Sequence, residues 1–173
     1  MDKDLPKRKL LRLRNFDYSN PGAYFITICT HNRKCILSHV VGAIHESPEM
    51  QLKECGKIVD YIINNIPKQC KAVVDRYVIM PNHIHLILVI TDDEELRAIR
   101  ESPLRGRSVI SKTIGYIKMN ASKQIHNALG YTNIWQRGFH DHIIRDQKDY
   151  EKITKYIYEN PIRWQFDELY EKE

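Results

Sequence analysis

The stretch that most constrains the fold is "YVIMPNHIHLILVI", Tyr77–Ile90. It holds two apolar runs rich in β-branched residues, separated by a Pro-Asn dipeptide that is typical of turns. The runs "KAVVDRYVIM" and "HIHLILVI" are therefore predicted as two consecutive strands. Residues two apart on a strand share a face, so His83 and His85 project side by side. Both faces of the second run are otherwise apolar, which predicts a central strand covered at least in part on each side.

Two adjacent imidazoles in such a strand must be hydrogen-bonded or must bind something. Neutral imidazole is a good metal ligand, and a rigid strand fixes the distance between His83 and His85. The alternative is that the two rings satisfy each other or backbone groups. The sequence holds no H-E-x-x-H motif, so it lacks that signature of a zinc hydrolase. The pair by itself leaves a metal site and a structural role open.

The remaining elements complete a recognisable order. A strand is predicted over residues 23–30 and an amphipathic helix over 51–66, whose apolar residues recur at helical spacing. A long helix follows Ser108 as its cap, and "FHDHIIRD" reads as a short strand. Asp146 caps a last helix, which must stop near Asn160 because Pro161 follows. The order β-α-β-β-α-β-α predicts an α+β fold, a ferredoxin-like β-α-β-β-α-β sandwich with an additional C-terminal helix. Another small α+β layer fold is the alternative.

The last helix carries a second set of chemical groups, in "KDYEKITKYIYENP". Lys152, Tyr156 and Asn160 lie four residues apart and form a polar line on one helix face. A nucleophilic hydroxyl and an amide ligand could therefore face the same point. The alternative is a partly buried tyrosine with its hydroxyl at the surface, in a chain that has ten tyrosines. Tyr158 should point about 200° away round the helix, and Tyr116 has no metal ligand paired with it.

Length and charge restrict the class of protein. The chain has 173 residues, enough for one domain with its own core, and a formal net charge of +5. Basic residues gather near the start and around residues 97–123. This distribution is compatible with nucleic-acid binding and also with ordinary charges on a solvated surface. No apolar run reaches membrane-spanning length and no signal-peptide core is seen, so we expect a cytoplasmic protein with no membrane partner. The four cysteines form no C-x-x-C pair and are interpreted as reduced thiols.

Taken together, several motifs resemble a known family. "FDYSNPGAYFITICT", "VIMPNHIHLIL", "WQRGFHDHIIR" and "YIYENP" occur in this order between about Arg12 and Trp164. The set resembles the REP-associated tyrosine transposases, relatives of the IS200-like transposases in the one-tyrosine HUH superfamily. This resemblance implies a ferredoxin-like fold. It also implies substrates that are single-stranded DNA ends and small imperfect hairpins, often palindromic repeats outside genes.

The resemblance also assigns roles to residues. His83 and His85 map onto two ligands of a divalent metal, Mg²⁺ or Mn²⁺, and Tyr156 maps onto the catalytic tyrosine. Asn160 takes the place of a third ligand, where the IS200-like branch typically has glutamine. The implied reaction is attack by Tyr156 on a phosphodiester, which gives a 5′-phosphotyrosine and a free 3′-OH that can later rejoin strands. The implied enzyme is a transposase and single-strand DNA endonuclease.

Further residues are assigned less direct roles. The whole chain, 1–173, is taken as one transposase domain, with a basic DNA-contacting segment at 1–20 and a C-terminal tail at 161–173. The second H-x-H motif, "HDH", places two supporting residues on its own strand, and Trp135 either stacks on a base or packs in the core. The predicted DNA contacts are Arg12, Arg14, Tyr18, Arg105, Arg107 and Lys112, and the predicted supporting residues are Lys152, Asp141 and His142.

Alternatives to this function remain at the level of sequence. The first is a DNA-hairpin-binding protein that no longer cuts, such as a domesticated transposase. Another is a metal-dependent phosphodiesterase that uses water instead of tyrosine. The resemblance leaves both a homodimer with shared active sites and a monomer open.

Overall fold

The computed structural model describes residues 20–41, 49–67, 70–91 and 108–172. Five of the predicted DNA contacts lie outside these ranges: Arg12, Arg14, Tyr18, Arg105 and Arg107.

The centre of the molecule is a four-stranded antiparallel sheet with the strand order β4-β5-β1-β6. Its strands are β1 (Gly22–Cys29), β4 (Val73–Ile79), β5 (His83–Ile90) and β6 (His140–Ile144). A small hairpin and then the helix α1 (Glu54–Asn64) come between β1 and β4 along the chain, and the helix α3 (Val109–Leu129) comes between β5 and β6. This connectivity and strand order confirm the predicted ferredoxin-like fold, with β5 as a central strand between β4 and β1.

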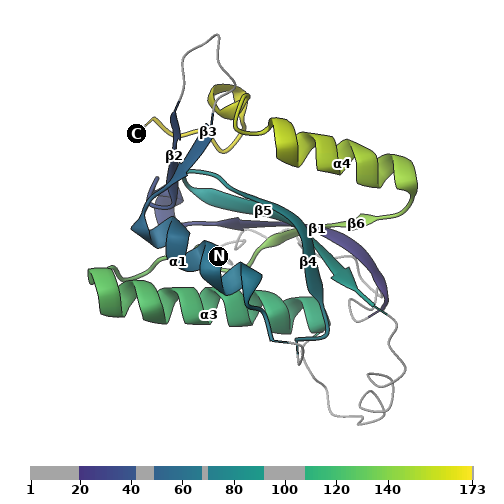
Figure 1. The fold of residues 1–173 in the computed structure, drawn as a ribbon, viewed down its shortest axis with the longest axis horizontal. Helices are drawn as coiled ribbons and strands as arrows, with labels where there is room; N and C mark the ends of the chain where they lie inside the picture. Colours follow the sequence, from purple (N-terminus) through teal and green to yellow (C-terminus); the bar gives the residue numbers. More distant parts are fainter. Residues whose placement is uncertain (1–19, 42–48, 68–69, 92–107, 173) are drawn as a thin grey trace, which may run out of the picture.

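The helices divide into two layers (Figure 1). α1 (Glu54–Asn64) and α3 (Val109–Leu129) cover one face of the sheet, and α4 (Gln147–Glu159) covers the other. Successive side chains of β1 and β5 point to opposite faces of the sheet. On one face they join the large core under α1 and α3, which includes Ile26, Ile84 and Leu86. On the opposite face, Ile87 packs with Ile153 and Ile157 of α4. The histidine pair lies on this α4 face.

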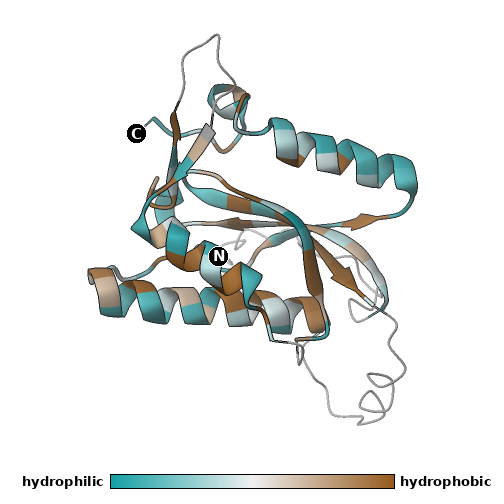
Figure 2. Cartoon of the chain, in the orientation of Figure 1, coloured by the Kyte–Doolittle hydropathy of each residue, from teal (hydrophilic) through white to brown (hydrophobic). Residues whose placement is uncertain are grey.

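α4 is an amphipathic helix, and it begins and ends where the sequence predicted. Asp146 Oδ1 accepts a hydrogen bond from the Asp149 amide at 2.8 Å and so caps its first turn. The helix ends at Glu159, and Asn160 and Pro161 follow it. Figure 2 shows that α4 is largely hydrophilic on its outer surface, which leaves a narrow apolar stripe to hold it on the sheet.

A two-stranded hairpin beside the main sheet was not predicted. It consists of β2 (Ser38–Val41) and β3 (Glu49–Leu52). Because β3 takes in Gln51 and Leu52, α1 begins at Glu54 and not at 51, and it ends at Asn64 and not at 66. Gly56 lets α1 pass close to the chain before this hairpin, since a Cβ there would lie 2.0 Å from the Leu37 carbonyl oxygen.

The long helix agrees with the sequence. Ser108 Oγ accepts a hydrogen bond from the Ser111 amide, and α3 ends at Leu129, followed by Gly130, whose φ of 73° lies in the left-handed region. Among the described helices, none is long and apolar enough to cross a membrane.

Candidate active site

The two histidines of β5 are buried and neutral. His83 is 0% exposed and His85 is 3% exposed, and their Nε2 atoms lie 2.9 Å apart. Burial, and then the nearby charge of Arg33, lower the pKa of His83 to about 3. Burial, and then the charge of His83, lower the pKa of His85 well below its ordinary value, although Asp167 opposes this shift. At neutral pH both rings therefore offer a lone pair rather than a positive charge.

The other nitrogen of each ring is held by a neighbouring side chain. His83 Nδ1 lies 2.8 Å from Asn82 Oδ1, and Asn82 Nδ2 donates to the Leu169 carbonyl at 2.8 Å. The second bond fixes the orientation of the Asn82 amide, so His83 carries its proton on Nδ1 and keeps the Nε2 lone pair. His85 Nδ1 lies 2.9 Å from Thr27 Oγ1, on the directly opposite residue of β1. A hydroxyl can donate or accept, so Thr27 supports either tautomer of His85.

Tyr156 reaches the histidine pair from α4. Its hydroxyl lies 3.3 Å from His85 Nε2 and donates to Asp167 Oδ2 at 3.2 Å. The phenol ring meets His85 edge-on, with centroids 5.2 Å apart, and it also contacts Phe25. The side chain is 41% exposed, so a substrate can reach the hydroxyl. His85 and Tyr156 belong to one chain and are 71 residues apart in sequence.

The environment of Tyr156 keeps its hydroxyl protonated. Burial first, and then the charge and hydrogen bond of Asp167, raise the pKa of Tyr156 to about 12, while a hydrogen bond from Asn160 opposes the rise. A positive charge in this position would act against the effect of the Asp167 carboxylate.

Asp167 is a member of this cluster that sequence reasoning missed. It follows a short 3₁₀ turn, Trp164–Phe166, that brings the chain back from α4 to the sheet. Ligand atoms of His83, His85 and Asp167 all lie within 4.8 Å of one another. The other carboxylate oxygen, Oδ1, accepts from the Leu169 amide at 2.7 Å. No periodic pattern marks Asp167, because it stands in an acidic stretch that reads as a solvated tail.

Asn160, the predicted third ligand, comes directly after α4 and contacts Asp167. It is 2% exposed, and its Nδ2 donates to Asp167 Oδ2 at 3.1 Å. Its Oδ1 is buried and has no hydrogen-bond partner in the described part of the chain. A buried carbonyl oxygen without a partner is costly unless it meets a ligand. The site therefore contains two imidazole nitrogens, one carboxylate and one orphaned amide oxygen beside a phenol.

Comparison with known proteins finds relatives that match most of the chain. No family model matches the chain. An uncharacterized protein of Haemophilus influenzae is 36% identical over 174 residues, covering 94% of this chain and 93% of that protein. A putative REP-associated tyrosine transposase of the same organism is 28% identical over 153 residues, 88% of this chain and 77% of the relative. The REP-associated tyrosine transposase of Escherichia coli is 25% identical over 146 residues, 84% of this chain and 70% of the relative. Two named relatives thus bear out, over most of the chain, its resemblance to the REP-associated tyrosine transposases.

The fold agrees with that of a solved REP-associated tyrosine transposase. That protein, in a structure bound to a REP hairpin, matches with a TM-score of 0.59 and 23% sequence identity, over 88% of this chain and 73% of the other. These similarities confirm the resemblance seen in the motifs.

Other residues that the sequence singled out lie away from the histidine pair. Asp141 pairs with Ile26 across the sheet, which places it on the α1 and α3 face. His142 lies on the α4 face, and its Nε2 is 2.8 Å from Asp149 Oδ2, so it ties β6 to the first turn of α4. Lys152 is exposed on α4, one turn before the catalytic candidate.

Lys112 and Trp135, which the sequence also singled out, belong to the α3 side of the sheet. Lys112 is exposed on α3, which covers the face of the sheet opposite the histidine pair. Trp135 packs against the large core and its indole donates to the Lys118 carbonyl at 3.1 Å. Trp135 is therefore a packing residue, which was the alternative to base stacking.

Proposed function

We propose that the protein is a metal-dependent single-strand DNA transposase and endonuclease. In this proposal it cleaves and rejoins DNA at palindromic-repeat hairpins through a 5′-phosphotyrosine. The observation that carries the proposal is the position of the Tyr156 hydroxyl, 3.3 Å from His85 Nε2, which itself lies 2.9 Å from His83 Nε2. The structural relative that binds a REP hairpin supports hairpin DNA as the substrate.

The residues fit a divalent metal, Mn²⁺ or Mg²⁺. His83 and His85 would supply nitrogen ligands, and Asp167 and the unpaired Oδ1 of Asn160 would supply oxygen. Mg²⁺ is a hard cation that prefers oxygen, so the two nitrogens suit Mn²⁺ at least as well. When bound, such an ion withdraws charge from the scissile phosphate and stabilises the departing 3′ oxygen.

The chain's own residues carry out the bond changes. The Tyr156 oxygen attacks the phosphorus and forms a new P–O bond, and the bond from phosphorus to the 3′ oxygen breaks. The phenol proton passes to Asp167 Oδ2, which already accepts it at 3.2 Å. The departing 3′ oxygen takes a proton from solvent. The phosphoester remains as a covalent phosphotyrosine, so a 3′-OH can reverse the step without ATP.

A covalent adduct tests this function. The protein is mixed with Mn²⁺ and a labelled single-stranded hairpin DNA, and the products are separated on a denaturing gel. Wild type should give a band that carries both protein and DNA, and Tyr156→Phe should give none while it still binds DNA. Tyr158→Phe is the matched control, because Tyr158 is 81% exposed on the same helix; it should keep the adduct.

Each other outcome contradicts a part of the proposal. An adduct that survives in Tyr156→Phe would show that another residue is the nucleophile. Cleavage without any adduct would identify a phosphodiesterase that uses water. Binding of the hairpin without cleavage in Mn²⁺ or Mg²⁺ would identify a DNA-binding protein that no longer cuts.

A further inference from the structure

A basic hollow opens beside the histidine pair. It measures about 550 Å³ and is lined by His31, Asn32, Arg33, Gln136, Arg137 and Glu171. A second hollow of about 450 Å³ shares three of these residues and adds Lys34, Cys35, Lys53 and Lys172. We call the two together the 31–35/136–137 groove. Five Arg or Lys side chains and a single Glu line it, so its potential favours an anion.

Both walls of the groove are fixed by hydrogen bonds of the main chain. The His31 amide donates to the Ile134 carbonyl at 2.8 Å, and the Gln136 amide donates to the Cys29 carbonyl at 2.9 Å. Lys118 Nζ donates to the Gln136 carbonyl at 2.6 Å. The groove is therefore a preformed feature of the fold, and a ligand would not have to order it.

The backbone at Asn32 and Arg33 is strained. Their φ angles are 53° and 51°, in the left-handed region that side chains other than glycine rarely adopt. Thr30 holds this turn, since its Oγ1 donates to the Lys34 carbonyl at 2.9 Å. Two consecutive strained residues that are not glycine indicate that their side chains are needed where the turn places them.

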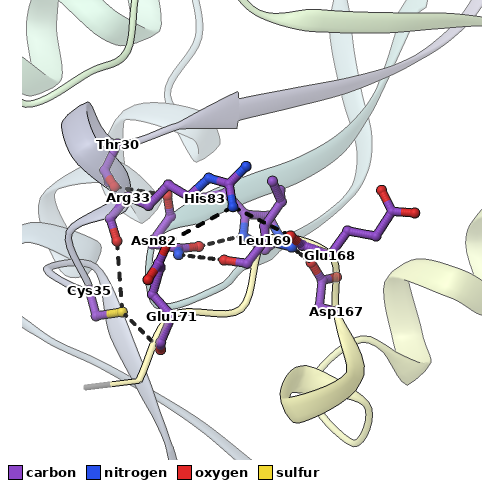
Figure 3. A network of polar contacts seen from close by, with 9 residues as sticks. All are labelled: Thr30, Arg33, Cys35, Asn82, His83, Asp167, Glu168, Leu169 and Glu171. Atoms are coloured by element: carbon purple, nitrogen blue, oxygen red, sulfur yellow. Dashed lines mark hydrogen bonds and ion pairs between the residues drawn. The ribbon is translucent and has the colours of Figure 1, made fainter.

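The groove adjoins the histidine pair. Figure 3 shows the Arg33 guanidinium next to His83. The Thr30 amide donates to the Asn82 carbonyl at 2.8 Å, and the Asn82 side chain holds His83. Asn82 thus connects Thr30, which holds the turn at the groove, to His83, the candidate metal ligand.

Glu171, the acidic residue of the groove, is loosely held. Arg33 and Glu171 lie 3.9 Å apart, with side chains 44% and 53% exposed. An exposed pair at this distance contributes little, so a phosphate can replace the carboxylate. Arg137 has no ion-pair partner among the residues that the structure describes.

We propose that the 31–35/136–137 groove binds the sugar-phosphate backbone of single-stranded DNA next to the scissile phosphate. Arg33 and Arg137 contact phosphates, and His31 lies against a sugar or base. The volume is that of a small-ligand pocket, which fits one or a few unpaired nucleotides. This proposal rests on the proposed function for the identity of the nucleic acid.

Binding without cleavage tests the groove. The probe is a fluorescein-labelled oligothymidylate of about 12 nucleotides, measured by anisotropy in EDTA with Tyr156→Phe as the parent protein. The variants are Arg137→Gln and Arg33→Gly; glycine suits the left-handed φ at 33, so that change removes the guanidinium without adding strain. Lys123→Gln, an exposed change on α3, is the matched control.

Each arginine variant should weaken binding by about tenfold, the usual effect of losing one charged hydrogen bond. Each should also reduce the slope of log affinity against log salt by about 0.7, as expected for one lost phosphate contact on a single strand. Lys123→Gln should change neither value. A blunt duplex of the same length should lose much less affinity than the single strand.

Unchanged affinity and slope in Arg137→Gln would overturn the proposal, and so would an equal loss on duplex and single strand. If Arg33→Gly unfolds earlier than its parent on heating, Arg137→Gln decides alone. An adduct in wild type with normal binding by the variants would refute the groove and leave the cleavage proposal standing. Weakened binding by the variants with no adduct in wild type would do the reverse.

Discussion

The hydroxyl of Thr27 should set the strength of the metal site without touching the metal. Thr27 lies directly opposite His85 in the β1–β5 pair, and its Oγ1 is 2.9 Å from His85 Nδ1. Thr27→Val keeps the shape of the side chain and removes only the hydroxyl. His85 Nδ1 is then left buried without a hydrogen bond, because the ring is only 3% exposed.

The magnitude follows from the cost of that unpaired nitrogen. Leaving one buried polar atom unsatisfied costs about 1–3 kcal/mol, and each kcal/mol should lower Tm by about 2–4 °C in a protein of this length. Loss of the group that orients a metal-ligating histidine typically weakens metal binding about 10–100-fold. That range corresponds to about 1.4–2.8 kcal/mol, so the two effects agree in size.

Two measurements and one control check this prediction. Mn²⁺ affinity is measured by titration with electron paramagnetic resonance detection of free Mn²⁺, and stability by urea unfolding. Thr27→Ser keeps the hydroxyl and loses a methyl group, so it should lose some stability but bind Mn²⁺ nearly as wild type does. If Thr27→Val bound Mn²⁺ as tightly as wild type, the hydroxyl would not orient His85 and this reasoning would be refuted.

Three further predictions concern packing and protonation. Gly56→Ala should destabilise the fold by about 1–3 kcal/mol, because the new Cβ would lie 2.0 Å from a carbonyl oxygen. Gly115→Ala, where the new Cβ meets nothing within 4 Å, should instead stabilise α3 by about 0.5–1 kcal/mol. Urea unfolding measures both variants, and equal effects would contradict the packing argument. The free energy of unfolding should fall as pH drops from 6.5 toward 3, because the pKa of His83 is lowered to about 3 and the unfolded chain binds a proton that the folded chain excludes. His83→Asn should flatten that pH dependence. An unchanged slope in this variant would contradict the role of His83. Asp167→Asn should lower the pKa of Tyr156 from about 12 toward 10, because the carboxylate supplies two of the effects that raise it; tyrosine-selective ¹³C NMR reads this value, and no change would show that burial alone sets it.

Local patterns were enough to predict the main sheet and its helices. The apolar residues on both faces of His83–Ile90 identified a central strand, and that strand does place His83 and His85 on one face. The cap at Asp146 and the proline after Asn160 gave the limits of α4. These signals are short-range, since a strand face or a helix cap depends on residues within a few positions of each other.

The parts that sequence could not give depend on contacts between distant segments. Asp167 reaches the site only because the chain turns back after α4, and nothing in its neighbours predicts that turn. Thr27 is 58 residues from His85 and meets it through strand pairing. The β2–β3 hairpin was missed because its strands are only four residues each, too short for a clear alternation.

The central claim is that one metal ion is shared by the two imidazoles beside the Tyr156 hydroxyl. Anomalous diffraction at the manganese edge, from crystals grown with Mn²⁺, tests it most directly. The account predicts one strong peak in contact with Nε2 of His83 and Nε2 of His85, next to the phenol oxygen, and its loss in crystals of His83→Ala. Manganese bound elsewhere, or a peak that persists in that variant, would contradict the account.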